Sequence, residues 1–181
     1  MVVGRLSRMV SAVVLALALS ACVSAPGCEE KPKAPEGFTV VNIKGHPFTL
    51  ELAVNDDTRM KGLGGREAIA ADGGMLFSFK RPEIRYFVMR DCPIDIDIIF
   101  LDGAGRVTRT HAMTAEAPRG EGEGEAGDYL NYKYHSRLKQ YSSRYAAKYA
   151  IELKGGTLEG LGVQEGDHIE LDTDLLERVT K

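Results

Sequence analysis

From residue 38 onward the chain consists of short apolar, β-branched runs separated by glycine and polar residues. The runs "FTVVNI" and "HPFTLEL" flank Lys44-Gly45, and this pattern predicts a β-hairpin closed by a tight turn. The apolar run over 73–79 is bounded by glycines and predicts a buried strand. Further strands are expected at 84–89, 94–101, 106–112, 147–153 and 167–171.

Helical signals are brief by comparison. Asn55 or Asp56 is suited to cap one or two helical turns, which the following glycines would end. Tyr134 and its neighbours recur at helical spacing and predict a helix over 131–142, preceded by a mobile, glycine- and acid-rich loop over 119–128. The expected fold class is mainly β with minor α+β character: a compact β-rich sandwich or open barrel with one or two short helices.

The first residues have a different composition. Arg5 and Arg8 precede an apolar run from Met9 to Leu19, which is typical of a secretory signal and short for a spanning helix. The run ends in "LSAC", which resembles a bacterial lipobox and predicts lipidation of Cys22. The alternative is a plain signal peptide in which Cys22 is incidental.

The predicted organisation follows from these segments. A signal peptide covers 1–21, and the lipidated cysteine with a Pro- and Lys-rich linker covers 22–37. One β-rich domain covers 38–172, with an insertion at 119–140, and residues 173–181 form a C-terminal tail.

Composition and charge bear on where the protein is located but do not indicate a reaction. The chain has 181 residues, 44% of them hydrophobic, and a formal net charge of −3, which suits one globular domain with appendages. An acidic domain that is anchored by an acyl chain such as palmitate would not be attracted electrostatically to an anionic membrane surface. Val23 after the cysteine favours the outer over the inner membrane where both exist, and export argues against a nucleic-acid partner.

Asp95 and Asp97 are the most prominent polar residues within an apolar run. On one strand over 94–101 they share a face and lie roughly 6–7 Å apart, a spacing that suits an acid/base pair or a hard cation. The simpler alternative makes Asp95 solvated, while Asp97 accepts backbone N–H groups or pairs with an arginine. Arg66, Arg85 and Arg90 are the arginines considered for that pairing.

The remaining chemical signals are weak. With Cys22 lipidated, Cys28 and Cys92 could pair in an oxidising envelope, but neither belongs to a CxxC pair. The four histidines lack metal-ligand spacing, and the glycine clusters lack the order of a phosphate-binding loop. We therefore expect no metal and no cofactor.

Several blocks resemble one known family. "RMKGLGGRE", "GGMLFSF", "FVMRDCPIDIDIIFLDGAGRV", "YSSRYAAKYAIELKGG" and "GLGVQEGDHIEL" are similar, in this order, to the blocks of the domain of unknown function 192 family, over about residues 50–171. The resemblance implies a β-rich, often exported domain, carries no activity over, and places Asp97 at a position that the family fills with Asp. It also implies loop and then strand from Tyr141 onward. The chain departs from the pattern at Gly64, at Asp91-Cys92 and in the longer segment between His111 and Tyr141.

Tyrosines interleaved with cations over 129–149 are the richest predicted contact surface, because such residues can stack on sugars and grip anionic polymers. The alternative is that many of these tyrosines pack the domain. The ligand-binding candidates are Met89, Asp97, Tyr132, Tyr134 and Tyr141.

Three functions remain open on the sequence. We expect first a lipid-anchored binding module for a cell-wall polymer or an envelope protein. The alternatives are a hydrolytic or metal-assisted enzyme that uses Asp97 with Asp95 and an arginine such as Arg66, and a purely structural or assembly factor.

Overall fold

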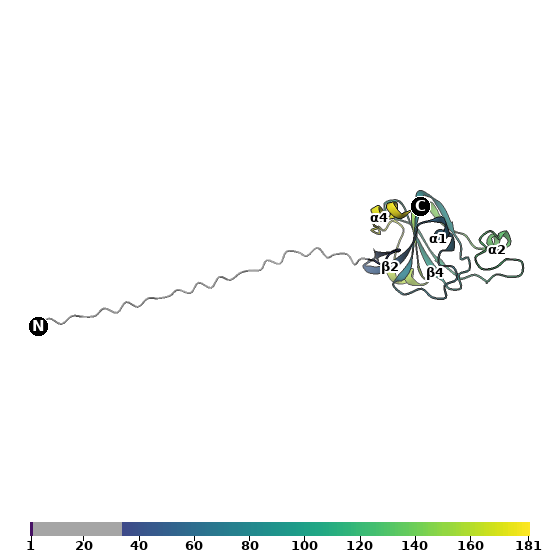
Figure 1. Cartoon of the computed structure of the whole chain (residues 1–181), viewed down its shortest axis with the longest axis horizontal. Coiled ribbons are helices and arrows are strands. Elements are labelled where there is room, and N and C mark those ends of the chain that lie inside the picture. Colours follow the sequence, from purple (N-terminus) through teal and green to yellow (C-terminus); the bar gives the residue numbers. More distant parts are fainter. Residues whose placement is uncertain (2–33) are drawn as a thin grey trace. The chain divides into compact units, whose positions relative to one another are not determined.

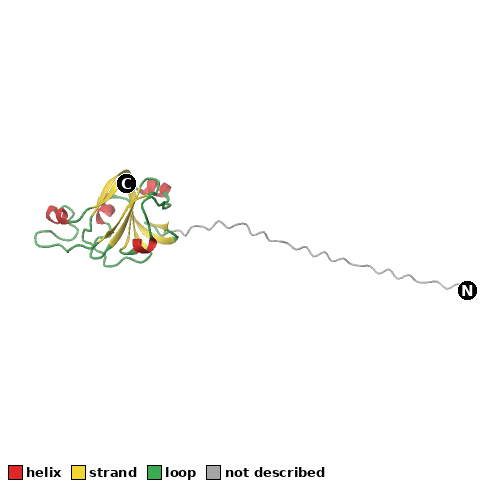
Figure 2. Ribbon diagram, turned by 180° about the vertical axis from the view of Figure 1, so that it is seen from behind, coloured by secondary structure: helices red, strands yellow, loops and turns green. Residues whose placement is uncertain are grey.

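The computed structural model describes Met1 and residues 34–181, so Cys22, Cys28 and the predicted signal peptide lie outside the described residues. The domain is built on one six-stranded sheet with short helices around it (Figures 1 and 2). Its elements are β1 (Phe38–Ile43), β2 (His46–Ala53), α1 (Asp56–Lys61), β3 (Gly73–Phe87), β4 (Ile96–Leu101), β5 (Val107–Met113), α2 (Tyr132–Arg137), β6 (Tyr141–Lys154), α3 (Thr157–Leu161) and α4 (Thr173–Val179).

The strands are ordered β1-β2-β3-β6-β4-β5. All neighbours pair antiparallel except β2 and β3, which run parallel and are joined by a crossover that contains α1. The mainly β fold with short helices is confirmed, and the sheet is open rather than a closed barrel.

The predicted hairpin is confirmed. Lys44 and Gly45 both have positive φ, 52° and 86°, as a tight turn between β1 and β2 requires. Asn42 Oδ1 accepts a hydrogen bond from Gly45 N at 2.8 Å, which fixes the turn from inside the hairpin. Asn55 is the N-cap of α1, and its side chain accepts from Thr58 N in a capping box.

The two strands predicted at 73–79 and 84–89 form one continuous strand, β3. β3 runs through both, and its pairing with β6 shifts register between Ser78 and Glu83, so the polar stretch at 80–83 is an irregularity within a strand and not a break. Gly74 is required in this strand, because a Cβ there would lie 2.2 Å from the carbonyl oxygen of Glu152.

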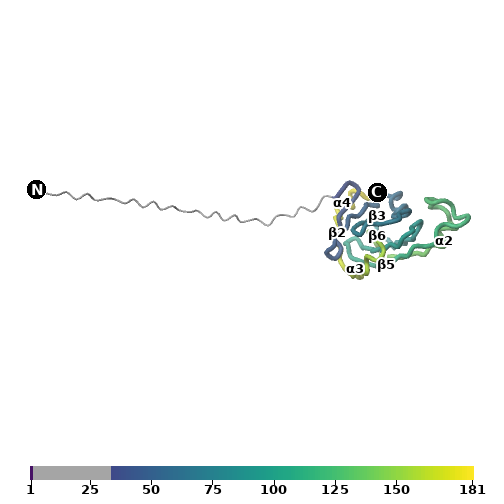
Figure 3. Tube along the Cα trace, turned by 90° about the horizontal axis from the view of Figure 1, so that it is seen from below, coloured from purple at the N-terminus to yellow at the C-terminus, as the bar shows by residue number. Residues whose placement is uncertain are grey.

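Three other boundaries need correction. The helix expected over 131–142 ends at Arg137, because the chain from Tyr141 onward pairs with β3 as β6. The segment 167–171 is not a strand: it forms a single bridge between His168 and Arg106. Residues 173–179, placed in a tail by the sequence, form α4 and bury Leu176. Figure 3 shows α4 and α2 at opposite ends of the domain.

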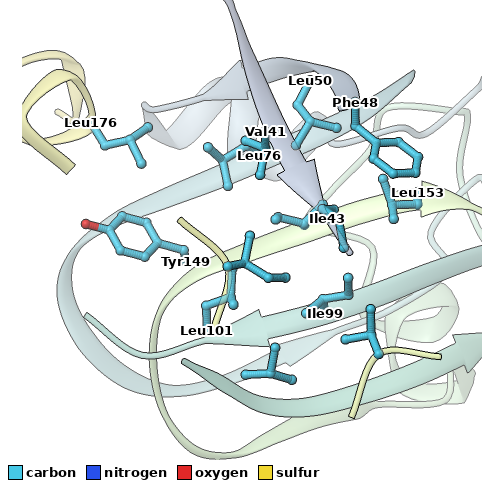
Figure 4. Packing of buried hydrophobic residues seen from close by; sticks show 14 residues of the cluster. Val41, Ile43, Phe48, Leu50, Leu76, Ile99, Leu101, Tyr149, Leu153 and Leu176 are labelled. Carbon is cyan, nitrogen blue, oxygen red and sulfur yellow. The ribbon is translucent and has the colours of Figure 1, made fainter. Parts of the chain in front are cut away.

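The sheet is buried on both faces. One cluster joins β1, β2 and α4 to the central strands, as Ile43, Leu50, Ile99 and Leu176 illustrate (Figure 4). The other face carries Phe77 and a second apolar cluster. It is this second face, partly covered by the α1–β3 and β3–β4 segments, that holds the candidate site.

Candidate functional site

A pocket with a cavity of about 370 Å³ opens on the second face, between α1, β3 and the end of β6. This volume lies within the range of small-ligand sites. The residues lining it come from five parts of the chain and combine aromatic rings, cations and one acid. They are Arg59, Met60, Lys61, Gly62, Leu63, Gly64, Phe77, Phe79, Ile84, Arg85, Tyr86, Phe87, Val88, Arg90, Cys92, His135, Gln140 and Glu152.

Phenylalanine rings form the apolar wall. Phe87 meets Phe77 edge-on at 5.0 Å between centroids and Phe79 at 6.5 Å. Phe77 and Phe79 are two residues apart on β3 and therefore project toward the same side, and Phe87 contacts both rings from beyond the irregularity in the strand. Such edge-to-face contacts fix the rings as a rigid surface.

Arg85 lies over this wall with one donor unused. Its guanidinium carbon is 4.0 Å from the centroid of Phe79, and Nη2 donates to Arg81 O at 2.6 Å. Glu83 is 3.3 Å from Nη1. Nε is buried and has no hydrogen-bond partner among the described residues. Burial lowers the pKa of Arg85, but a guanidinium remains charged at neutral pH.

Two other arginines line the pocket. Arg59 donates to Ser78 O, Asp56 Oδ1 and Lys181 O, each at 2.8 Å. Nη2 of Arg90 lies 3.0 Å from His135 Nδ1. These two arginines therefore contribute positive charge, while Arg85 also has a free donor.

Glu152 forms the buried, acidic end of the pocket. It is 6% exposed, and its neighbours across the strand are apolar: Met75 on β3 and Ile98 on β4. Oε2 has no hydrogen-bond partner among the described residues. Burial raises the pKa of Glu152 to about 8, against a smaller opposing effect of Arg66, so the side chain is a neutral acid at neutral pH.

Cys92 lies beside this acid. Its thiol donates to Arg90 O at 3.3 Å, and burial, with the nearby carboxyl groups of Glu152 and Asp91, raises its pKa to about 12. A thiol in that state is a weak nucleophile. Because Cys28 lies outside the described residues, the disulfide between Cys28 and Cys92 stays a prediction.

Asp97 is a buried acceptor of backbone N–H groups, as the simpler alternative from the sequence had it. It is 1% exposed, and every residue of β4 is buried, since β4 lies between β5 and β6. Asp97 Oδ2 accepts from Leu158 N at 2.7 Å, and Gly156 and Thr157 also donate backbone N–H groups to this carboxylate. Asp97 thus holds the start of α3, and burial still raises its pKa.

Asp95 and Arg66 are engaged elsewhere. Asp95 lies before β4 rather than within it, and its Oδ1 accepts from Ala115 N at 2.7 Å. Arg66 forms a two-fold pair with Glu51, at 2.5 and 2.6 Å. The three catalytic candidates from the sequence therefore have separate partners, and none of them lines the pocket.

The five ligand-binding candidates also lie outside the pocket lining. Met89 and Tyr141 are buried in the second cluster. Tyr132 is 82% exposed, whereas Tyr134, two residues further on α2, is 2% exposed. The tyrosine-rich stretch thus divides into packed and exposed members.

Tyr134 holds the insertion in place. The guanidinium groups of Arg119 and Arg137 lie over its ring at 4.0 and 4.8 Å, and its hydroxyl accepts from Asp91 N at 2.9 Å. Arg119 also pairs with Asp91, and Arg137 pairs with Glu123, each at 2.7 Å. Arg137 lowers the pKa of Glu123 to about 2. The segment expected to be a mobile loop is a loop without helix or strand, but it is tied to α2 by these contacts.

Sequence reasoning missed the pocket because its residues are far apart along the chain. One signal was present: Glu152 is the single acid within the apolar run "YAIEL". Arg85 was considered only as a partner of Asp97, whereas the structure places it over Phe79 and beside Glu83.

Two general features of the described part of the chain bear on function. None of its helices is both long and apolar enough to span a membrane. In this part of the chain no cluster of three or more His, Cys, Asp or Glu side chains is arranged to bind a metal ion.

Comparison with known proteins supports one family. Two solved structures match the chain, both with a TM-score of 0.56. A proposed transcription regulator from Sinorhizobium meliloti 1021 is 28% identical, with 72% of this chain and 89% of that chain covered. A protein of unknown function from Novosphingobium aromaticivorans DSM 12444 is 26% identical, with 74% and 83% covered. No curated protein matches.

The family model described as "Uncharacterized ACR" matches residues 39–171, which is nearly the whole of the described domain. Since the pocket, Asp97 and all of the strands but the first residue of β1 fall within the matched range, the family assignment applies to the fold as described. The chain belongs to the domain of unknown function 192 family.

Proposed function

We propose that this protein is an exported, lipid-anchored binding domain of the cell envelope whose pocket holds an anionic segment of a cell-wall polymer. The observation that carries the proposal is Arg85, whose buried Nε has no partner in a pocket lined by aromatic rings. A buried donor without an acceptor is costly, and a ligand that supplies the acceptor recovers that cost.

The charge of the pocket selects an anion. Arg59, Lys61, Arg85 and Arg90 line it, and Glu152, which is neutral at neutral pH, is the one acidic residue among its described lining residues. The lining therefore carries more positive than negative groups on a chain whose formal net charge is −3, although Arg59 and Arg85 also lie beside Asp56 and Glu83. A local positive site on an acidic body attracts negative ligands.

The mouth of the pocket suits a partner larger than a free ion. Met60, Ile84 and Tyr86 line it, and all three are large hydrophobic residues exposed to solvent. An exposed apolar rim around a polar centre is typical of an interaction site. Cell-wall polymers that combine carboxylates with methyl groups and sugars match this combination. Export and anchoring are inferred from residues 1–37 of the sequence.

The test is co-sedimentation of the purified full-length protein with isolated cell wall. Arg85→Gln should weaken binding about tenfold or more, because hydrogen bonds to charged groups contribute roughly 1.5–3 kcal/mol. Arg109→Gln is the matched control: its guanidinium pairs with Glu165 at 2.6 Å and does not line the pocket. Equal binding by the two variants, or no binding by the unaltered protein, would contradict the proposal.

A further inference from the structure

We infer that the pocket recognises the free carboxyl end of a peptide in the wall polymer, and that Glu152 donates a hydrogen bond to this carboxylate. The inference rests on the proposed function and names the group that the pocket binds. It uses the second polar group of the pocket that has no partner among the described residues, Glu152 Oε2.

Glu152 is accessible from the cavity although it is fully buried in the protein. Gly62 lies beside it: a Cβ on Gly62 would be 3.8 Å from Glu152 Oε2 and 3.5 Å from Phe77 Cζ. Because Gly62 has no side chain, no side chain from this position fills the space next to the carboxyl group. A ligand that enters past the Phe77 ring can therefore reach Glu152.

The protonation state of Glu152 determines which ligand group it can bind. As a neutral acid it offers an O–H donor, and an O–H bound to a carboxylate oxygen is among the stronger hydrogen bonds in proteins. The groups that act on it electrostatically are Arg66, which is paired with Glu51 of β2, and Cys92 from the β3–β4 segment. Lys61 of α1, Arg90 of the β3–β4 segment and His135 of α2 line the same pocket. Arg66 stays positive and the Cys92 thiol stays neutral between about pH 6 and about pH 9.

The rest of the pocket matches a peptide end. Phe77 lies near Glu152, Arg85 stacks on Phe79, and Phe87 contacts both rings. A carboxylate at Glu152 would thus be followed by apolar groups against the rings. A carbonyl further back along the peptide could accept from Arg85 Nε. Carboxylate, apolar group and carbonyl occur in this order at the end of a peptide.

The experiment is calorimetric titration of the full-length protein with D-Ala-D-Ala peptides that end in a carboxylate or in an amide. We expect the carboxylate form to bind at least about tenfold more tightly at pH 6.5. Its affinity should fall about tenfold per pH unit above pH 8, where Glu152 loses its proton. Glu152→Gln keeps an N–H donor and should bind with a flat pH profile, whereas Glu165→Gln should behave as the unaltered protein does.

Each other result overturns a defined part of the inference. A flat profile in the unaltered protein, or equal binding of amide and carboxylate, excludes Glu152 as the donor, while co-sedimentation with wall leaves the proposed function standing. Peptides that end in L-Ala-L-Ala are titrated in the same way, and tighter binding of these would assign the site to a protein tail and overturn the wall peptide. If neither wall nor peptide binds, the proposed function fails as well. Thermal unfolding of each variant shows whether it is folded.

Discussion

At the residue scale, Glu152 combines three features that seldom occur together: full burial, apolar neighbours on both adjoining strands, and an oxygen without a hydrogen-bond partner among the described residues. Isolated buried carboxylates are too costly to keep charged, so such groups take up a proton instead. The raised pKa of Glu152 is therefore a consequence of its strand position, and it makes the stability of the fold depend on pH.

Glu152→Gln should stabilise the protein relative to the unaltered chain as pH rises. In the unfolded chain Glu152 ionises at its ordinary pKa, 4.5, but in the fold it does so only at about 8. The unaltered fold therefore loses stability between these two values, by about 2 kcal/mol or more, whereas a glutamine has no proton to lose.

The measurement is chemical unfolding of both proteins at several values between about pH 5 and about pH 9. Their difference in unfolding free energy should grow in favour of the variant until about pH 8 and then level off. Parallel stability profiles would show that Glu152 ionises normally in the fold.

At the element scale, the sequence predicted those turns and helix ends that a few adjacent residues determine. The β1–β2 hairpin followed from Lys44-Gly45 and the α1 cap from Asn55, because turns and caps are set by a few adjacent residues. The end of α2 and the length of β3 did not follow, because both depend on pairing with β6. Asp97 stood out correctly as unusual, but its partners at 156–158 are brought to it only by the fold.

Tyr134→Leu should release the insertion from α2. The substitution removes the ring under Arg119 and Arg137 and the hydroxyl that accepts from Asp91 N. The expected cost is about 2–4 kcal/mol, since a buried aromatic with two cation–π contacts is lost. Limited proteolysis and hydrogen exchange over 119–130 should both become faster.

Tyr132→Leu is the matched control for this prediction, because Tyr132 lies on the same helix but is 82% exposed. It should leave stability and proteolysis of the insertion nearly unchanged. If both variants behave alike, the arginine–tyrosine contacts do not hold the loop. The control also tests the surface role expected for the tyrosines: reduced wall binding by Tyr132→Leu alone would add Tyr132 to the contact surface.

At the scale of the whole molecule, the proposed lipid anchor would assist binding by the pocket. A site that binds the wall benefits from a tether that keeps it near the wall, because tethering raises the effective concentration of the partner. The Pro- and Lys-rich composition over 23–37 is typical of a linker and would form the proposed tether. The proposed tether depends on lipidation of Cys22, which stays a prediction from the sequence motif because Cys22 lies outside the described residues.

Cys22→Ala should therefore move the protein from the membrane fraction to the soluble envelope fraction. The unaltered chain should co-fractionate with membranes and carry acyl chains on Cys22, detected as added mass on the N-terminal peptide, because stable anchoring needs more than one acyl chain or a second signal. Cys28→Ala is the control, since it lies in the linker outside the lipobox. Density-gradient separation then distinguishes outer from inner membrane, with the outer expected from Val23. A Cys22→Ala protein that stays in the membrane fraction would mean that the apolar run at 9–19 anchors the chain uncleaved, and that the domain reaches the wall without a lipid.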